Sequence, residues 1–225
     1  MTKITEYNSR DALFHGLAHC VGQQLETALS AKTHATLAVP GGTTPAPFFE
    51  RLRQNPLDWK NIRVTLTDER FVPESSDRSN TRLLRQTLFQ DHAADAQFIP
   101  LYAPADQPED VLPALRMGVT QVLPLDVCVL GMGTDMHTAS LFPGADLLAE
   151  ALGDTAPTVL PMRAPNAPEP RMTLSAPVLR GAGHVHLLIT GPDKKQALQN
   201  AMELTDETLA PVRCILAQAH VHYAD

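Results

Sequence analysis

Residues 125–144, LDVCVLGMGTDMHTASLFPG, contain the clearest fold signal in this chain and its densest group of polar candidate residues. The first six residues form a short apolar run, which predicts a buried strand. Two glycines follow at once, as is typical of a strand that ends in a sharp turn. Helical sequence resumes near Asp146. We interpret the stretch as one unit of strand, polar loop and helix.

The same unit recurs along the chain. Further apolar runs at 35–39, 62–67 and 184–190 each lead into a polar loop and then into helical sequence. Strands that are apolar on both faces and alternate with helices predict a parallel sheet covered by helices on both sides. We therefore expect an open, mostly parallel, Rossmann-like α/β sheet, built as a single domain over residues 1–225.

Four polar loops follow these strands: GGTTP, TDER, GTDMH and GPDKK. In an open α/β sheet the carboxyl ends of parallel strands meet at one edge, and ligands collect there. The four loops are therefore expected to converge on one site.

Three further elements are predicted around the sheet. Apolar residues at three-four spacing over 9–31 predict a surface helix, with Ser9 placed to cap its start. The proline-rich segment 156–170 is interpreted as an extended connector over the surface. The closing HVHYAD, 220–225, is interpreted as a short edge strand.

Composition limits the classes of function. The chain has 225 residues, 44% of them apolar, and a formal charge of −7. No basic cluster suits nucleic acid or an anionic membrane, and no apolar run reaches the roughly 20 residues that span a bilayer. The N-terminus lacks the pattern of a signal peptide, so we expect a cytoplasmic protein. Cys20, Cys128 and Cys214 lack the spacing of a disulfide framework or a zinc site.

The best anion-binding signal is the loop Gly41-Gly42-Thr43 before a predicted helix. Glycines expose backbone amides, and a helix amino terminus adds partial positive charge. An ordinary strand-to-helix turn would use the same residues, so the signal is moderately specific.

Two pairs of polar residues are candidates for catalysis. Asp135 lies two residues before His137 and can orient or polarise its imidazole, which is the pairing that a general base near neutral pH requires. At another strand end, the Arg70 guanidinium could orient a carboxylate or carbonyl oxygen. Asp68 could hold Arg70 there through paired hydrogen bonds.

Other chemistries fit less well. A dinucleotide fingerprint needs a third glycine where this chain has Met136. Ser140 lacks the context of a nucleophile elbow. His184 and His186 share one strand face, but spacing places no third metal ligand, and polar alternation on an edge strand explains them. We therefore expect no metal.

Together the motifs resemble the 6-phosphogluconolactonase family over nearly the whole chain. The resemblance is carried by VPGGTTP at 39–45, TDERFVP at 67–73, SN at 79–80, LGMGTDMHTASLFPG at 130–144, RMTLS at 171–175 and GPDKK at 191–195. It implies hydrolysis of 6-phosphogluconolactone in the oxidative pentose phosphate pathway without metal or organic cofactor. It also implies the three-layer α/β/α fold shared with glucosamine-6-phosphate deaminase.

The resemblance also implies roles for particular residues. His137 would be the base that activates water, with Asp135 beside it, and Arg70 with Asp68 would face the lactone. The phosphate would lie on the glycine loop and Asn80, with Arg171 and Lys194 closing on it. The implied partner is a small phosphorylated sugar lactone, and we expect a monomer or weak homodimer that binds neither nucleic acid nor membrane.

The chain departs from the family pattern at Met136, where glycine is usual. We expect Met136 to adopt negative φ and to direct its side chain away from the sugar pocket. Two rival functions are a glucosamine-6-phosphate deaminase and a non-catalytic sugar-phosphate sensor. The deaminases have a glutamate five residues after the histidine, where this chain has Phe142, and a sensor would need a separate DNA-binding segment.

Overall fold

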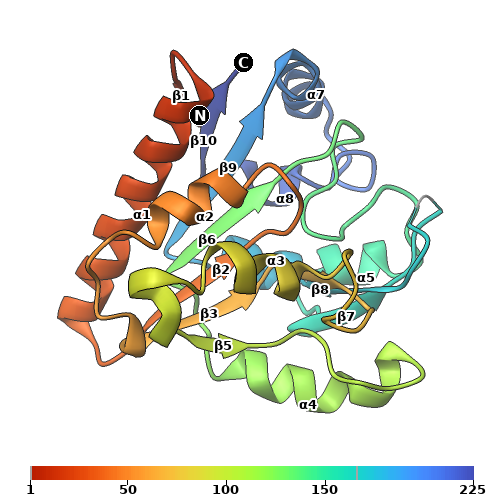
Figure 1. Ribbon diagram of the computed structural model, residues 1–225. Coiled ribbons are helices and arrows are strands. Elements are labelled where there is room, and N and C mark those ends of the chain that lie inside the picture. Colours follow the sequence, from red (N-terminus) through yellow and green to blue (C-terminus); the bar gives the residue numbers. More distant parts are fainter. Residues whose placement is uncertain (1, 166) are drawn as a thin grey trace.

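The computed structural model describes residues 2–165 and 167–225, and its main element is a seven-stranded sheet (Figure 1). The strand order is β1-β10-β9-β6-β2-β3-β5, and every neighbouring pair is parallel. The strands are β1 (Lys3–Glu6), β2 (Ala35–Val39), β3 (Ile62–Leu66), β5 (Gln97–Ile99), β6 (Val127–Gly131), β9 (His184–Thr190) and β10 (Ala219–Ala224). The predicted open parallel α/β sheet is confirmed.

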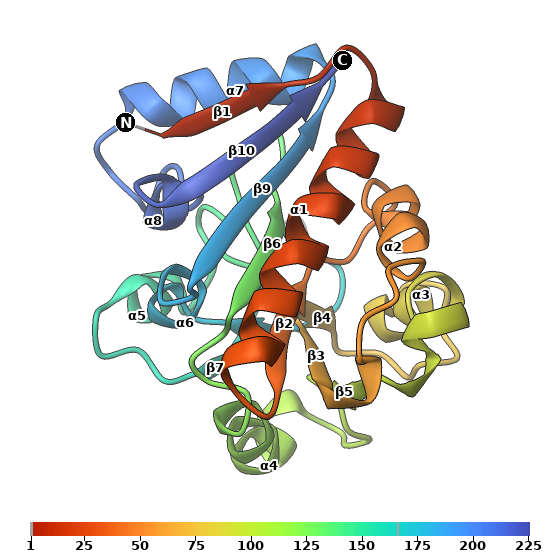
Figure 2. The same cartoon turned by 90° about the vertical axis from the view of Figure 1, so that its left-hand side faces the viewer.

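Helices cover both faces of this sheet. Figure 1 shows α1 on one side of the sheet and α7 with α8 on the other, and Figure 2 looks onto the side that α1 covers. The helices are α1 (Arg10–Ala31), α2 (Ala46–Leu52), α3 (Asn80–Thr87), α4 (Pro108–Thr120), α5 (Leu148–Leu152), α6 (Ala176–Arg180), α7 (Pro192–Glu203) and α8 (Arg213–Leu216), with short 3₁₀ turns at Trp59–Asn61 and Asp91–Asp95. Among the described residues, no helix combines the length and apolarity that crossing a membrane requires.

Helix α1 forms where its sequence pattern predicts it. The Ser9 hydroxyl accepts a hydrogen bond from the backbone N–H of Ala12 at 3.1 Å, which satisfies one of the unpaired amides of the first turn. Leu13, Leu17 and Val21 follow at four-residue spacing and are completely buried. This apolar stripe packs α1 against β2, β6 and β10.

A second, smaller sheet was not predicted. It is antiparallel, with the order β4-β8-β7, and consists of β4 (Asp68–Arg70), β8 (Arg171–Leu174) and β7 (Val159–Met162). The buried strand β7 lies within 156–170, so the expectation of a plain surface connector is wrong there. Pro161 is tolerated because β7 is an edge strand of this sheet. Asn166 of the same segment lies outside the described residues.

The prediction that the chain closes with an edge strand is also wrong. Strand β10 pairs with both β9 and β1, and β1 forms the edge. Strand β1 has only four residues, and most of them are exposed, so its sequence carries no apolar signal. Consequently β9, which holds His184 and His186, is an interior strand.

Candidate active site

One cavity of about 270 Å³ lies where the four polar loops meet. Every residue proposed from sequence as catalytic or substrate-binding lines it except Asp135, which contacts His137. Those lining residues are Gly41, Gly42, Thr43, Asp68, Arg70, Asn80, His137, Arg171 and Lys194. They come from segments far apart in sequence, so the predicted convergence of the loops is confirmed.

The glycine loop owes its shape to a close approach and to one unusual backbone conformation. A Cβ at Gly41 would come within 2.0 Å of the Asn80 side chain, so only glycine allows this contact. Gly42 has φ +89°, a left-handed conformation that residues with a Cβ rarely adopt. Asn80 is itself held by a hydrogen bond from its Nδ2 to the Asp68 carbonyl at 2.9 Å.

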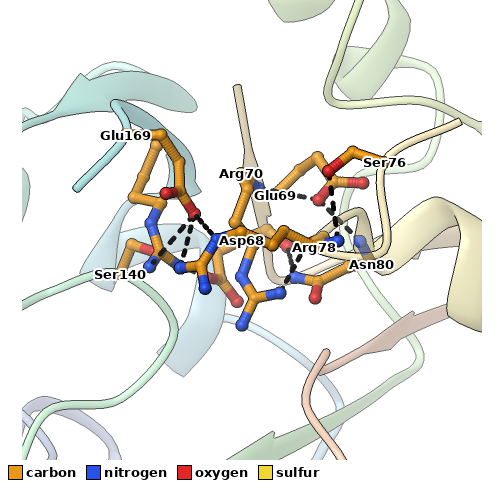
Figure 3. Close-up of polar contacts among 9 residues, drawn as sticks. Asp68, Glu69, Arg70, Ser76, Arg78, Asn80, Ser140 and Glu169 are labelled. Carbon is orange, nitrogen blue, oxygen red and sulfur yellow. Dashed lines mark hydrogen bonds and ion pairs between the residues drawn. The ribbon is translucent and has the colours of Figure 1, made fainter. Parts of the chain in front are cut away.

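Glu69 fixes the backbone of Asn80, whose side chain lies against Gly41, and no role for Glu69 was predicted from the sequence. Its completely buried carboxylate accepts hydrogen bonds from the backbone N–H groups of Arg70 (2.7 Å), Asn80 (2.8 Å) and Thr81 (2.7 Å). The hydroxyls of Thr81 and Ser79 also donate to it, at 2.8 and 3.2 Å. Burial raises the pKa of Glu69, and the bonds from Asn80, Thr81 and Arg70 oppose that shift. Glu69 thus ties the start of α3 to β4 (Figure 3).

The antiparallel pairing of β4 with β8 brings two arginines together. Arg70 and Arg171 are directly opposite each other in the register. Arg171 is only 7% exposed and lies 5.7 Å from the centre of the Phe142 ring. Burial lowers the pKa of Arg171; the charge of Asp68 opposes this shift and that of Arg70 adds to it. The small sheet therefore supplies a concentrated positive charge to the cavity.

The expectation that Asp68 pairs with Arg70 is wrong. Asp68 Oδ2 accepts a hydrogen bond from the Ser140 hydroxyl at 2.5 Å, and the Arg70 Nη1 donates instead to the Arg78 carbonyl. Ser140 is completely buried, so its hydroxyl needs this partner. Asp68 thereby joins β4 to the loop that carries His137.

Glu169 does not line the cavity, but its carboxylate contacts two arginines, Arg78 and Arg171 (Figure 3). Its Oε1 is 2.9 Å from Arg78 Nε and 2.8 Å from Arg78 Nη2, and it is 3.8 Å from Arg171 Nη2. These contacts orient two guanidinium groups that would otherwise repel each other.

His137 and Asp135 form a hydrogen-bonded pair. The His137 Nδ1 lies 2.5 Å from Asp135 Oδ1, and this bond to His137 holds the pKa of Asp135 below its usual value. A Cβ at Gly133 would lie 2.3 Å from His137 Nδ1, so glycine is required beside the pair. An Nδ1–H that donates to Asp135 leaves Nε2 as the basic nitrogen. The Phe142 ring packs against the imidazole with a centroid distance of 4.3 Å.

Met136 has φ +65°, so the expectation of negative φ is wrong. Backbone hydrogen bonds impose this conformation: the Met136 N–H donates to the Gly133 carbonyl, and the Met136 carbonyl accepts from the Val212 N–H, both at 3.0 Å. The side chain is partly buried against the hydrophobic core and does not line the cavity, as expected. The substitution therefore strains the backbone but leaves the cavity open.

Lys194 closes the cavity from the first turn of α7. It is half-buried, and burial lowers the pKa of its ammonium. No carboxylate of the described residues opposes that shift. An anionic ligand in the cavity would therefore be attracted by the Lys194 ammonium and by the guanidinium groups of Arg70 and Arg171.

The chain is similar to known proteins over nearly its whole length. Residues 8–223 match the family described as glucosamine-6-phosphate isomerases/6-phosphogluconolactonase. A 6-phosphogluconolactonase of Rhizobium meliloti is 47% identical over 216 residues, covering 95% of this chain and 93% of the relative. One from Pseudomonas aeruginosa is 43% identical, covering 92% and 89%.

Solved structures of known proteins share the fold of this chain. The crystal structure of a 6-phosphogluconolactonase from Shewanella baltica has a TM-score of 0.97 and 33% identity, and the match covers 100% of this chain and 98% of that one. A monomeric glucosamine-6-phosphate deaminase of the NagB superfamily has a TM-score of 0.78 at 17% identity, which shows the shared fold.

Glu69 provides a first prediction. Glu69→Gln keeps the size of the side chain but replaces one acceptor oxygen by an NH₂ group that faces the donors of Ser79 and Thr81. We expect a lower free energy of unfolding, by about 1–3 kcal/mol, because buried donors lose their acceptor. Urea unfolding of this variant measures the loss. Glu74→Gln, at an exposed ion pair with Arg85, is the control and should lose at most about 1 kcal/mol. Equal effects in both variants would show that Glu69 is not an anchor.

Position 136 provides a second prediction. Met136→Gly relieves the left-handed strain and loses the side-chain packing, whereas Met136→Ala loses the packing and keeps the strain. We expect the glycine variant to be more stable than the alanine variant by about 1 kcal/mol, with turnover within a few fold of the parent. Thermal unfolding of the two variants side by side makes the comparison. An alanine variant as stable as the glycine variant would contradict the strained conformation.

Proposed function

We propose, because the chain belongs to the glucosamine-6-phosphate isomerase/6-phosphogluconolactonase family, that this cavity is a lactonase active site in which His137 is the general base. The enzyme hydrolyses 6-phospho-D-glucono-1,5-lactone to 6-phospho-D-gluconate in the oxidative pentose phosphate pathway. One observation carries the residue roles: an Asp-oriented imidazole and a group of cationic side chains face the same cavity.

The phosphate is assigned to the end of the cavity formed by the glycine loop. There the backbone of Gly41, Gly42 and Thr43 precedes α2 and can donate N–H groups to an anion. Arg171 and Lys194 line the same cavity and supply positive charge. Burial lowers the pKa values of both side chains because it disfavours their charged forms, and a phosphate dianion beside them offsets this desolvation cost.

The chemistry follows from the pair of His137 and Asp135. Nε2 of His137 takes a proton from water as the water oxygen attacks the lactone carbonyl, while Asp135 stabilises the imidazolium through Nδ1. The carbonyl oxygen becomes an oxyanion, which Arg70 faces and stabilises. When the intermediate collapses, the bond from C1 to the ring oxygen breaks. The proton on Nε2 then passes to that oxygen, so the imidazole is neutral again and the product is an open-chain acid.

Phe142 argues against the deaminase alternative. The residue occupies the position where the family's deaminases have a glutamate, and its ring packs on the His137 imidazole and lines the cavity. An apolar ring there cannot share a proton with His137. The site is therefore suited to a single histidine acting in both halves of a hydrolysis.

The cellular setting is also a proposal. The pathway assigned to the enzyme runs on phosphorylated sugars, which do not cross membranes readily, and we place the protein in the cytoplasm as a monomer or weak homodimer. The net charge of −7 is unfavourable for binding nucleic acid, so the small phosphorylated lactone is its expected partner.

His137→Ala should lower kcat for the phosphorylated lactone by a factor of about 10² to 10⁴, because a general base typically contributes that much. The measurement couples 6-phosphogluconate formation to 6-phosphogluconate dehydrogenase and subtracts spontaneous opening of the lactone. His184→Ala, on an exposed residue outside the cavity, is the control and should keep parental turnover. Near-parental turnover in His137→Ala would remove this residue from the mechanism.

Two neighbouring lysines test the phosphate assignment. Lys194 lines the cavity, whereas Lys195 points to Glu6, with its Nζ 2.9 Å from the carboxylate. Lys194→Ala should raise KM for the phosphorylated lactone by about tenfold or more, and Lys195→Ala should leave KM unchanged, because only Lys194 can form a charge-assisted contact with the phosphate. Both variants should hydrolyse the unphosphorylated lactone at the parental rate. If Lys194→Ala slows hydrolysis of the unphosphorylated lactone by the same factor as that of the phosphorylated one, Lys194 is not a phosphate ligand.

A further inference from the structure

Three histidines that the lactonase chemistry does not use meet on the face of the sheet covered by α1. His186 lies on β9, and His220 and His222 lie on β10, with His220 directly opposite His186 in the parallel register. Figure 2 shows β9 and β10 side by side. Side chains two residues apart on a strand share a face, so both β10 histidines are on the side of His186. One nitrogen from each ring lies within 4.8 Å of the other two.

The outer nitrogens of these rings are already held by oxygen partners. His186 Nε2 lies 2.8 Å from Gln24 Oε1 on α1, and His222 Nδ1 lies 2.8 Å from the Tyr7 hydroxyl. His220 Nε2 lies 2.8 Å from Thr5 Oγ1 on β1. Ligating histidines in metal sites are oriented in this way, by a hydrogen bond at the nitrogen that does not bind the metal.

We propose that His186, His220 and His222 bind one divalent transition metal ion of the zinc type, at a site separate from the lactone cavity. None of the three lines that cavity. His186 Nδ1 and His222 Nε2 are 3.0 Å apart, close to the separation of about 3.3 Å between two nitrogens of a tetrahedral zinc site. The two buried rings thus need to move apart by only a few tenths of an ångström.

His220 completes the site from its half-exposed position. Its ring centroid is 4.1 Å from that of His222 and 5.9 Å from that of His186. A change of its side-chain torsions brings a ring nitrogen to the ion. Its exposure also provides the entry path and leaves the fourth position for water, as in sites with three protein ligands.

The local charges suit a neutral-histidine site of moderate affinity. Burial is the main cause that lowers the pKa of His186 to about 3 and that of His222 to about 2, so both rings are neutral near pH 7, as metal ligation requires. No Asp, Glu or Cys of the described residues joins the group. The ammonium of Lys3 acts on all three rings and opposes a dication. Because all three ligands are neutral, the bound ion would keep most of its positive charge.

The alternative is a purely hydrogen-bonded relay. Without metal, the Tyr7 hydroxyl donates to His222 Nδ1, His222 Nε2–H donates to His186 Nδ1, and His186 Nε2–H donates to Gln24. This relay satisfies two buried rings and makes no use of His220. In the metal-bound form His222 carries its proton on Nδ1 and donates to Tyr7, so the hydrogen bonds of the two buried rings to Tyr7 and Gln24 are kept. The two alternatives therefore differ in one measurable respect: only a metal site gives His220 a contribution to the affinity for Zn²⁺.

The test titrates the chelator-stripped full chain with Zn²⁺ at neutral pH against a chromophoric competitor. We expect the parent to bind one Zn²⁺ ion per chain. In His220→Gln the affinity for Zn²⁺ should fall by at least about tenfold. In His184→Gln the affinity should stay at the parental value, because this exposed ring on β9 is outside the group. Lys3→Met should strengthen binding because it removes the opposing charge. Co²⁺ in place of Zn²⁺ should give the visible absorption of a four-coordinate site in the parent and not in His220→Gln.

Several outcomes would overturn the proposal. They are no binding by the folded parent chain, equal affinity in His220→Gln and His184→Gln, or displacement of the ion by saturating 6-phosphogluconate, which would place it in the lactone cavity. Zn²⁺ should raise the midpoint of thermal unfolding of the parent but not of His220→Gln, and lactone turnover should be the same with and without the ion. A shift of equal size in both chains would show that the metal binds elsewhere.

Discussion

The buried carboxylate of Glu69 is the constraint on which the proposed active site depends. Its two oxygens accept hydrogen bonds from the end of β4 and from the first turn of α3, and the bond from Asn80 Nδ2 to the Asp68 carbonyl joins the same two segments. Through this contact Asn80 is held against Gly41, and β4 is held in the register that places Arg70 opposite Arg171. A charge buried without partners would be costly, so the five donors and the carboxylate require each other.

The charge distribution explains how an acidic protein binds an anionic substrate. The chain carries a net charge of −7, yet three of the titratable side chains that line the candidate active-site cavity, Arg70, Arg171 and Lys194, are cationic. Asp68 lies among them but is engaged by Ser140, and Glu169 holds Arg78 and Arg171 from outside the cavity. Positive charge is thus concentrated where the phosphate and the oxyanion are proposed to lie, and nearby carboxylates orient the guanidinium groups.

Much of the fold and most of the cavity could be predicted from the sequence. Apolar runs followed by glycine loops predict parallel strands, and parallel strands must gather their loops at one edge, so His137 and Lys194 come together although they are far apart in the chain. The small antiparallel sheet could not be predicted, because β4, β7 and β8 have only three or four residues each and show no alternation. The role of Glu69 depends on a helix start eleven residues later, for which no sequence rule exists.

The errors at single residues have the same origin, since each depends on tertiary partners. Asp68 bonds Ser140 from a distant loop, and Met136 is held at positive φ partly by the Val212 N–H. The two histidines that lie beside His186, His220 and His222, come from β10, whose register against β9 is invisible in the sequence. Interior placement of β9 also removes the explanation that its histidines alternate on an edge strand.

The most direct test of the proposed active site is a crystal structure with 6-phosphogluconate bound. The phosphate should contact the Gly41-Gly42-Thr43 backbone together with Arg171 and Lys194, and the C1 carboxylate should lie within hydrogen-bond distance of His137 Nε2 and Arg70. A ligand bound in the reverse direction, with its phosphate at His137, or a C1 carboxylate beyond reach of Nε2, would contradict the account.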